Sequence, residues 1–255
     1  MRPARPAVRF HSSRTVDFVV VGSGAAGGII AKELATAGLT VVVLEQGPRV
    51  EPPQFEHDEI KTLFQGALQI NPTGFTFRRS ESETAKPGQI QLLYHRLVGG
   101  GSVMFTANYW RFREIDFIEK SRLGAISGTG LEDWPITYRD LEPYYTKAEW
   151  ELGISGEPGP FDPPRTRPYP LPPLPVKSSG VLFERGARAL GLHPQPAPLA
   201  ILSQPFHGRP ACQHCGYCLG FGCEFRAKSS TLYTVIPIAE ATGRCEVRPN
   251  SYVRR

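Results

Sequence analysis

The sequence predicts an α/β fold organised around a nucleotide-binding βαβ unit at residues 16–46. A short, β-branched apolar run at 18–21 is typical of a parallel strand that is buried on both faces, and a second such run follows at 41–44. Between the two runs lie a glycine turn and a segment whose apolar residues recur at helical spacing up to Gly38. We therefore expect strand, turn, helix and strand in this order.

The glycine turn has the pattern G-x-G-x-x-G, formed by Gly22, Gly24 and Gly27. Gly22 permits the tight turn, Gly24 lets the backbone approach a pyrophosphate, and Gly27 lets the helix pack close to the strand. The pyrophosphate would lie at the helix N-terminus, where free N–H groups and the helix dipole favour negative charge. The pattern predicts a phosphate-binding turn.

An acidic residue, Glu45, ends the second apolar run, 21 residues beyond Gly24. A carboxylate at this place can accept hydrogen bonds from the ribose hydroxyls of an adenosine. Because strand, turn, helix, strand and acid follow in register, the segment predicts an ADP-containing cofactor rather than a glycine-rich turn of an unrelated α/β unit. We expect replacement of Glu45 to weaken cofactor binding with little change in the fold.

The composition is that of a folded chain of one large or two modest domains, with 255 residues, 40% apolar and 21% charged. The net charge is +5, but the basic residues are scattered, so we expect a solvated surface and no nucleic-acid partner. No apolar run approaches the roughly 20 residues of a membrane span. Residues 1–15 hold four arginines and no acid, which predicts a basic disordered lead-in rather than a signal peptide, although an organellar presequence is an alternative. The default location is cytoplasmic, with export alongside a partner as an alternative.

Several further elements follow along the chain. A helix is predicted after Trp134, and the residues on one of its faces are Leu141, Tyr144, Tyr145, Ala148 and Leu152. We expect the two tyrosines of this face to lie in the core. Residues 155–180 hold nine prolines and predict a loop. The other predictions are a short helix at 59–68, a second glycine turn at 99–102, a helix at 181–190 and a strand at 244–253 interrupted at Pro249.

Four segments resemble the glucose–methanol–choline (GMC) oxidoreductases, flavoenzymes that oxidise alcohols and sugars, above all the branch of gluconate, fructose and glucose dehydrogenase flavin subunits. They are VVVGSGAAGG…VVVLEQG, RLVGGGSVMFTANYWRFRE, DWPITYRDLEPYYTKAEWELGISG and RPACQHCGYCLGFGCEFRAKSS. The resemblance implies a Rossmann-like FAD-binding domain of the GMC type at 16–116 and 225–255. It also implies the start of a substrate (cap) domain at 117–224.

In this family the second glycine turn passes along the pyrophosphate and the flavin ring. The resemblance therefore implies that Gly100, Ser102 and Thr106 contact FAD and that the backbone of Val253 contacts the adenine. A simple hairpin turn at residues 99–102 is the alternative interpretation when the resemblance is set aside. The second turn favours FAD over an NAD-type domain.

Two departures from the family pattern matter. A histidine that bonds covalently to flavin in several relatives is replaced by Met104, and Phe105 follows, so we expect FAD to be bound non-covalently. Relatives carry the catalytic His-His or His-Asn pair near the end of a chain about twice as long. None of the six histidines occupies that position. His95, near the flavin turn, is more simply a structural residue. We therefore assign no catalytic residue and expect no turnover by this chain as given.

Four of the five cysteines form the run Cys212-x2-Cys215-x2-Cys218-x4-Cys223, close to iron–sulfur spacing. In the related dehydrogenases a cysteine segment at this place holds a three-iron cluster that passes electrons from flavin to a haem partner, with a different spacing. A cluster is the favoured interpretation, and disulfides, zinc and free thiols stay open. Cys245 is most simply a small buried hydrophobe.

The resemblance implies an FAD-dependent dehydrogenase acting on the CH–OH group of a sugar, polyol or sugar acid. Electrons would leave through the cysteines to an acceptor other than NAD, such as a cytochrome subunit or a quinone. Two alternatives remain, namely an oxidase that uses oxygen and a catalytically silent flavin-binding fragment. Residues that would select the substrate are not identified in this sequence.

Overall fold

The computed structural model describes residues 9–11, 13–61, 76–87 and 95–254. The chain divides into two compact units. Unit 1 comprises Met1–Thr106 and Cys215–Arg255, and unit 2 comprises Ala107–His214. Their assignment as an FAD domain and a cap region stays a prediction.

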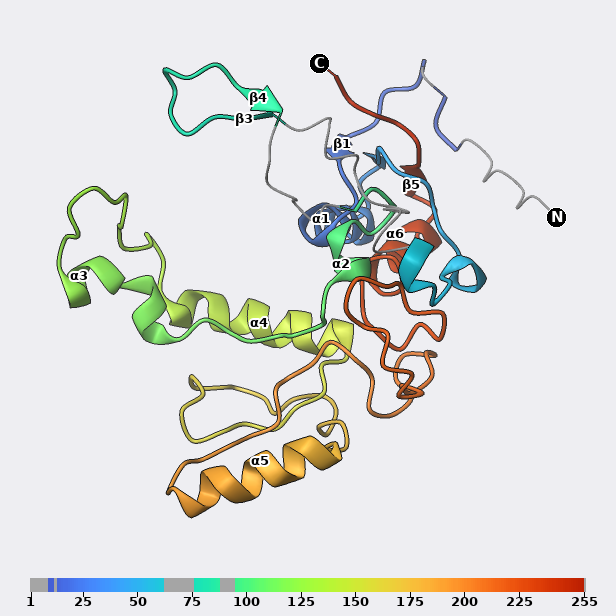
Figure 1. Ribbon diagram of the computed structural model, residues 1–255. Coiled ribbons are helices and arrows are strands. Elements are labelled where there is room, and N and C mark those ends of the chain that lie inside the picture. Colours follow the sequence, from blue (N-terminus) through green and yellow to red (C-terminus); the bar gives the residue numbers. More distant parts are fainter. Residues whose placement is uncertain (1–8, 12, 62–75, 88–94, 255) are drawn as a thin grey trace. The chain divides into compact units, whose positions relative to one another are not determined.

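Unit 1 contains a parallel sheet in the order β1 (Phe18–Val21), β2 (Val41–Leu44) and β5 (Cys245–Arg248). Helix α1 (Ala25–Thr36) joins β1 to β2, and α6 (Val235–Ala241) precedes β5. The two helices pack against each other, and each also contacts the sheet (Figure 1). The predicted βαβ unit is therefore confirmed. The predicted strand at 244–253 is confirmed only in its first part, because β5 ends just before Pro249 and residues 249–254 form no strand.

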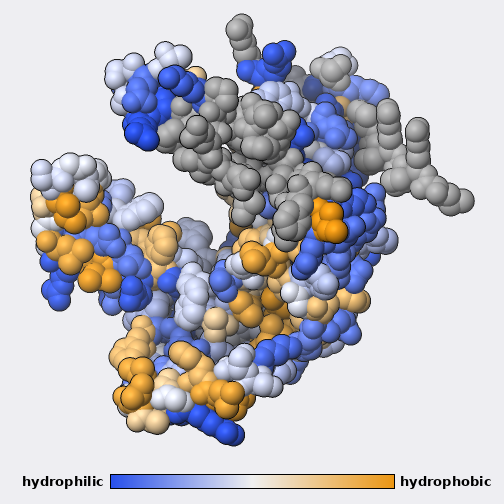
Figure 2. Space-filling model, in the orientation of Figure 1, coloured by the Kyte–Doolittle hydropathy of each residue, from blue (hydrophilic) through white to orange (hydrophobic). Residues whose placement is uncertain are grey.

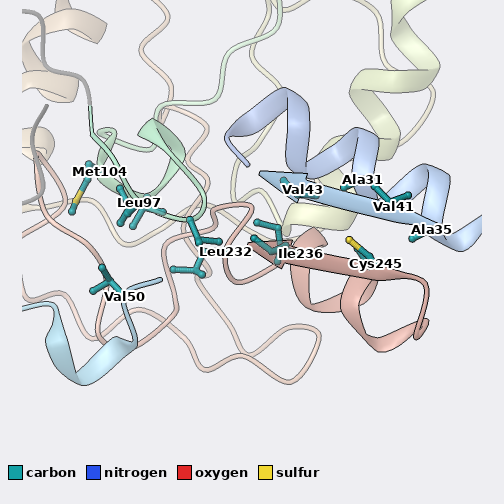
Figure 3. Close-up of a cluster of buried hydrophobic side chains, with 14 of the residues drawn as sticks. Ala31, Ala35, Val41, Val43, Val50, Leu97, Met104, Leu232, Ile236 and Cys245 are labelled. Atoms are coloured by element: carbon teal, nitrogen blue, oxygen red, sulfur yellow. The ribbon is translucent and has the colours of Figure 1, made fainter. Parts of the chain in front are cut away.

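The hydrophobic core of unit 1 is centred on β2, where Val41 and Val43 are fully buried. Alanines of α1 and side chains of α6 complete the layer, and Leu97 and Met104 extend it toward the second glycine turn (Figure 3). Cys245 is also part of this core, and burial raises the pKa of its thiol to about 11. The prediction that Cys245 acts as a small hydrophobe is confirmed.

The prediction that the first strand is buried on both faces is wrong. Phe18, Val19 and Val21 are 44%, 57% and 66% exposed, and only Val20 packs against the core cluster. Within the described ranges, β1 pairs with β2 alone and lies at the edge of the sheet. A run of four β-branched and aromatic residues has the same pattern at an edge as in the centre, so the sequence could not distinguish the two.

The remaining elements of unit 1 are short. They are a 3₁₀ helix at Pro52–Gln54, an antiparallel pair of β3 (Thr76–Phe77) and β4 (Lys86–Pro87), and α2 (Gly101–Met104) in the second glycine turn. Most of the helix predicted at 59–68 lies outside the described residues. Among the residues described, no helix combines the length and the apolar character that crossing a bilayer requires.

The named elements of unit 2 are helices, joined by long irregular segments. They are a 3₁₀ helix at Glu114–Phe117, α3 (Glu119–Leu123), α4 (Tyr138–Leu152) and α5 (Ser178–Ala189). The predicted helices near 141–152 and 181–190 are thus confirmed, and the proline-rich segment between them forms no helix. Large hydrophobic side chains remain exposed on α5, including Leu182 and Phe183, and orange patches lie among white and blue surface in this region of Figure 2.

The buried face of α4 differs from the predicted one. It carries Glu142, Thr146 and Glu149, whereas Tyr144 is 68% exposed. The buried guanidinium of Arg111 bonds Glu149 at 2.8 and 2.7 Å and Glu142 at 3.1 Å, which offsets the desolvation cost of the two carboxylates. The apolar periodicity located the helix correctly. It indicated the wrong inner face because a single sequence does not show the arginine that faces the polar stripe.

Candidate functional site

The first glycine turn connects β1 to α1. Gly22 has a φ of +88°, a conformation that glycine adopts without strain. A Cβ on Gly27 would lie 2.0 Å from the carbonyl oxygen of Gly22, so only glycine lets the helix begin this close to the turn. The steric reasons inferred from the sequence for these two glycines are therefore present in the fold.

Within the described part of the chain, nothing fills the space next to Gly24 at the start of α1. Gly24 occupies the N-cap position, and among the described residues no side chain caps the first N–H groups of the helix. A Cβ on Gly24, or on Gly101 in the second turn, would meet no described atom within 4 Å. Uncapped N–H groups and the positive end of the helix dipole favour an anionic group at such a place.

The second glycine turn lies directly against the first. Gly99 and Gly100 have φ values of +95° and +55°. A Cβ on Gly100 would lie 3.0 Å from the Cα of Gly24, so the two turns touch through glycine backbone. The hydroxyl of Ser102 donates to the Gly99 carbonyl at 2.6 Å and closes the second turn.

Two buried hydroxyl residues that the sequence analysis missed hold the turns together. The Ser23 hydroxyl donates to Glu45 at 2.7 Å and accepts from the backbone N–H of Gly99 at 3.0 Å. The Thr231 hydroxyl donates to the Ser23 carbonyl at 3.0 Å, and its backbone N–H donates to Ser102 at 3.2 Å. The first turn, the second turn and the chain before α6 thus form one hydrogen-bonded unit. The serine–threonine run at 229–231 was the only sequence signal for it.

Glu45 lies at the carboxyl end of β2 and is only 5% exposed. One carboxylate oxygen accepts from the backbone N–H and the hydroxyl of Ser23, and the other accepts from the backbone N–H of Gly47 at 2.9 Å. A carboxylate offers about four acceptor positions, so one stays open. Glu45 therefore stabilises the first glycine turn in addition to any contact with a ligand. We correct the expectation that its replacement leaves the fold little changed, because three hydrogen bonds would be lost.

The other predicted ligand residues lie further out. The segment after β5 runs beside the end of β2, where the N–H of Ser251 donates to the Glu45 carbonyl at 2.7 Å. Val253 follows and is 37% exposed, and Thr106 is also exposed. The structure thus brings together the glycines of both turns, Glu45 and Ser102, and leaves Val253 and Thr106 at the surface.

The cysteine loop, residues 215–223, belongs to unit 1 and packs against the second glycine turn. The N–H of Gly220 donates to the Met104 carbonyl at 3.0 Å. The ammonium of the buried Lys228 donates to the carbonyls of Phe105, Cys218 and Phe221. Burial lowers the pKa of Lys228 to about 8, although the neighbouring cysteines act in the opposite direction.

The structure does not assemble the predicted four-cysteine iron–sulfur site. Cys212 belongs to unit 2, whereas Cys215, Cys218 and Cys223 belong to unit 1. Among the described residues no disulfide joins any two of the five cysteines, and no three His, Cys, Asp or Glu side chains gather as metal ligands. The geometry therefore supports neither the cluster nor the disulfide or zinc alternatives.

The histidine near the second turn, His95, is half-buried. Burial lowers its pKa, and the nearby charge of Lys228 adds to this effect. Met104, which replaces the histidine of several relatives, is 3% exposed and packs in the core. A buried methionine has no ring nitrogen and so cannot form the histidine–flavin bond of those relatives.

Comparisons with known proteins agree with this geometry. Residues 17–52 match the family of FAD binding domains. The chain is 32% identical over 281 residues to the gluconate 2-dehydrogenase flavoprotein of Pantoea cypripedii, covering 95% of this chain and 45% of that protein. It is 33% identical to paromamine 6'-oxidase of Streptomyces fradiae, covering 86% and 37%. It is 29% identical to an uncharacterized GMC-type oxidoreductase of Mycobacterium tuberculosis, covering 89% and 30%. The chain thus spans less than half the length of these relatives.

Proposed function

We propose that this chain, which belongs to the GMC oxidoreductase family, binds FAD non-covalently in unit 1. The observation that carries the proposal is the contact between the two glycine turns beside an uncapped helix N-terminus. Ser23 and Thr231 hold this arrangement before any ligand is present, and a preorganised site loses less binding energy to ordering. When bound, FAD supplies the electron acceptor for hydride transfer.

Each part of the site has a proposed role toward FAD. The open N-terminus of α1 at Gly24 would receive the pyrophosphate. The remaining acceptor position of Glu45 would receive a ribose hydroxyl. Gly100, Ser102 and Thr106 would line the cofactor along the second turn, and the backbone of Val253 would contact the adenine.

The whole protein's activity is proposed as FAD-dependent oxidation of a CH–OH group in a sugar, polyol or sugar acid. The gluconate 2-dehydrogenase relative supports a dehydrogenase, and the paromamine 6'-oxidase relative supports the oxidase alternative. The dehydrogenase would pass electrons to an acceptor other than NAD. Substrate-dependent reduction of a dye without peroxide would support the dehydrogenase, whereas peroxide formation would support the oxidase. This chain provides no assigned base for the alcohol proton.

We also propose a second cofactor, an iron–sulfur cluster at Cys212, Cys215, Cys218 and Cys223. This proposal rests on the spacing of the four cysteines alone. A redox partner subunit such as a cytochrome would then accept electrons. Iron and acid-labile sulfide should co-purify under anaerobic conditions, and serine at one of the four positions should deplete both. Bound zinc in the purified protein, or a thiol titration that shows the cysteines paired as disulfides, would contradict the cluster.

The decisive experiment adds FAD to the purified chain and removes unbound cofactor by gel filtration. We expect one FAD per chain with a shifted flavin absorption spectrum, and acid precipitation should release all of it. Absence of bound FAD would contradict the proposed function. Flavin retained on the acid pellet would contradict non-covalent binding.

A further inference from the structure

Lys228 is a buried cation that donates hydrogen bonds to three backbone carbonyls. Its side chain is among the largest that are fully enclosed, with 2% of the residue exposed. The ammonium donates to Phe105 at 2.9 Å, to Cys218 at 2.7 Å and to Phe221 at 2.7 Å. An ammonium has three N–H donors, so these bonds use its whole donor capacity. Lys228 therefore has no donor left for a ligand and acts on the protein itself.

The three acceptors belong to two segments that are far apart in the sequence. Phe105 is the C-cap of α2, the short helix that begins in the second glycine turn, while Cys218 and Phe221 belong to the cysteine loop. One ammonium thus bridges the proposed flavin-facing turn and the loop. The backbone bond between Gly220 and Met104, at 3.0 Å, joins the same two segments a second time.

The cysteine loop depends on such anchors because it contains no helix or strand. Gly216 and Gly220 take φ values of +88° and +79° within it. At its end, a Cβ on Gly222 would lie 2.0 Å from the ring of Phe55, so the loop also packs tightly at this point. Charge-assisted bonds from a buried donor are stronger than neutral ones, which makes Lys228 the principal tether of the carbonyls.

We propose that Lys228 is a positioning residue that couples the cysteine loop to the second glycine turn. FAD bound at the turn stabilises the loop, and a chemical change at the loop thiols weakens FAD binding. The FAD half of this inference rests on the proposed function, whereas the tether itself does not. By linkage, closure of the loop strengthens FAD binding by the same factor by which bound FAD favours closure of the loop.

The first test measures amide hydrogen exchange of the full chain without FAD. Lys228→Met removes the ammonium, so the carbonyls of Phe105, Cys218 and Phe221 lose this donor. We expect exchange to accelerate at least tenfold in both 101–105 and 215–223. Lys32→Met is the matched control, because Lys32 is also buried in unit 1 and its ammonium bonds Glu33 instead. Unchanged exchange in either segment, or the same acceleration in the control, would overturn the tether.

The second test adds FAD. In the unchanged protein FAD should slow exchange in 215–223, and alkylation of the loop cysteines with iodoacetamide should weaken FAD binding. In Lys228→Met both effects should disappear even if FAD still binds. Coupling that survives in the variant would overturn the inference. If FAD does not bind the unchanged protein, the proposed function fails, and the exchange measured without FAD still decides the tether.

A third measurement covers the case in which Lys228→Met does not fold. Reductive methylation of the unchanged protein, mapped by mass spectrometry, reports the accessibility of each lysine. Alkylation of the cysteine loop should accelerate methylation of Lys228 at least tenfold, while the partly exposed Lys120 stays constant as a reference. Equal rates at Lys228 before and after alkylation would contradict the coupling.

Discussion

Both units bury polar side chains, but they satisfy them in different ways. In unit 1, the buried Ser23 and Glu45 bond mainly to each other and to backbone N–H groups of the glycine turns. In unit 2, the buried Arg111 is paired with Glu142 and Glu149, and charge is balanced by charge. The difference matters for interpreting a sequence, because a site built on backbone geometry requires glycine at fixed positions. A site built on charge pairing produces no fixed spacing of residues that could be recognised in the sequence.

The two arrangements should also respond differently to mutation. Removing one member of a buried ion pair leaves an uncompensated charge, whereas removing an acceptor of backbone N–H groups leaves neutral donors unpaired. We therefore expect the largest loss of stability in unit 2 and the largest loss of ligand affinity in unit 1.

Arg111→Met tests the ion network. It leaves the buried carboxylate of Glu142 without an arginine partner and Glu149 with Arg165 alone. The network then keeps one uncompensated negative charge, so the free energy of unfolding should fall by about 3–5 kcal/mol. Urea unfolding followed by near-ultraviolet circular dichroism measures this loss. Arg188→Met is the control in the same unit, because the Arg188–Glu184 pair is exposed, and its loss should cost about 0.5 kcal/mol or less. Equal losses of stability in the two variants would contradict the conclusion that the buried ion network stabilises unit 2 more than an exposed ion pair does.

Acid titration tests the same network without a mutation. Burial tends to raise the pKa of Glu142, but hydrogen bonds from Thr166, Thr146 and Arg111 outweigh it and hold the pKa at about 2, below the ordinary 4.5. Because the folded-state pKa is depressed, the stabilisation is fully present above pH 4.5 and is lost as the pH falls toward 2. Circular dichroism against pH should show this loss. Glu142→Gln should flatten the dependence, and an unchanged curve would contradict the assignment.

Glu45→Ala tests the polar site of unit 1. It removes three hydrogen bonds to Ser23 and Gly47 together with the open acceptor position proposed for ribose. FAD affinity should fall at least tenfold, which corresponds to about 1.4 kcal/mol, and stability should fall as well. Fluorescence titration measures the affinity and thermal unfolding measures the stability. An unchanged affinity would mean that Glu45 serves the fold alone.

The sequence predicted those elements whose formation depends on residues close together in the chain. The strand–turn–helix–strand unit was confirmed because glycine turns and apolar periodicity act within about 30 residues. The exposure of β1 was not predictable, since it depends on which strands pair with it. The contact between Ser23 and Thr231 joins residues 208 apart, and one sequence contains no sign of such a pairing.

The same limit applied to the polar stripe of α4 and to Lys228. Each is a polar feature that the sequence would place at the surface, and each is buried by partners far along the chain. Conversely, cysteine spacing suggested a gathered ligand set, although Cys212 belongs to a different compact unit from the other three cysteines. The spacing of residues in a sequence determines which side chains come together only where the backbone between them is a regular helix or strand.

The most direct test of the central claim, that the two glycine turns form one FAD site, is the FAD affinity of Gly24→Ala. Gly24 has a φ of −63° and open space where an added methyl group would lie, so the fold should accept alanine with little change in thermal stability. Gly186→Ala, at another open glycine, in α5, is the control. We expect at least a tenfold loss of FAD affinity in Gly24→Ala and none in the control. Full affinity in a stable Gly24→Ala protein would contradict it.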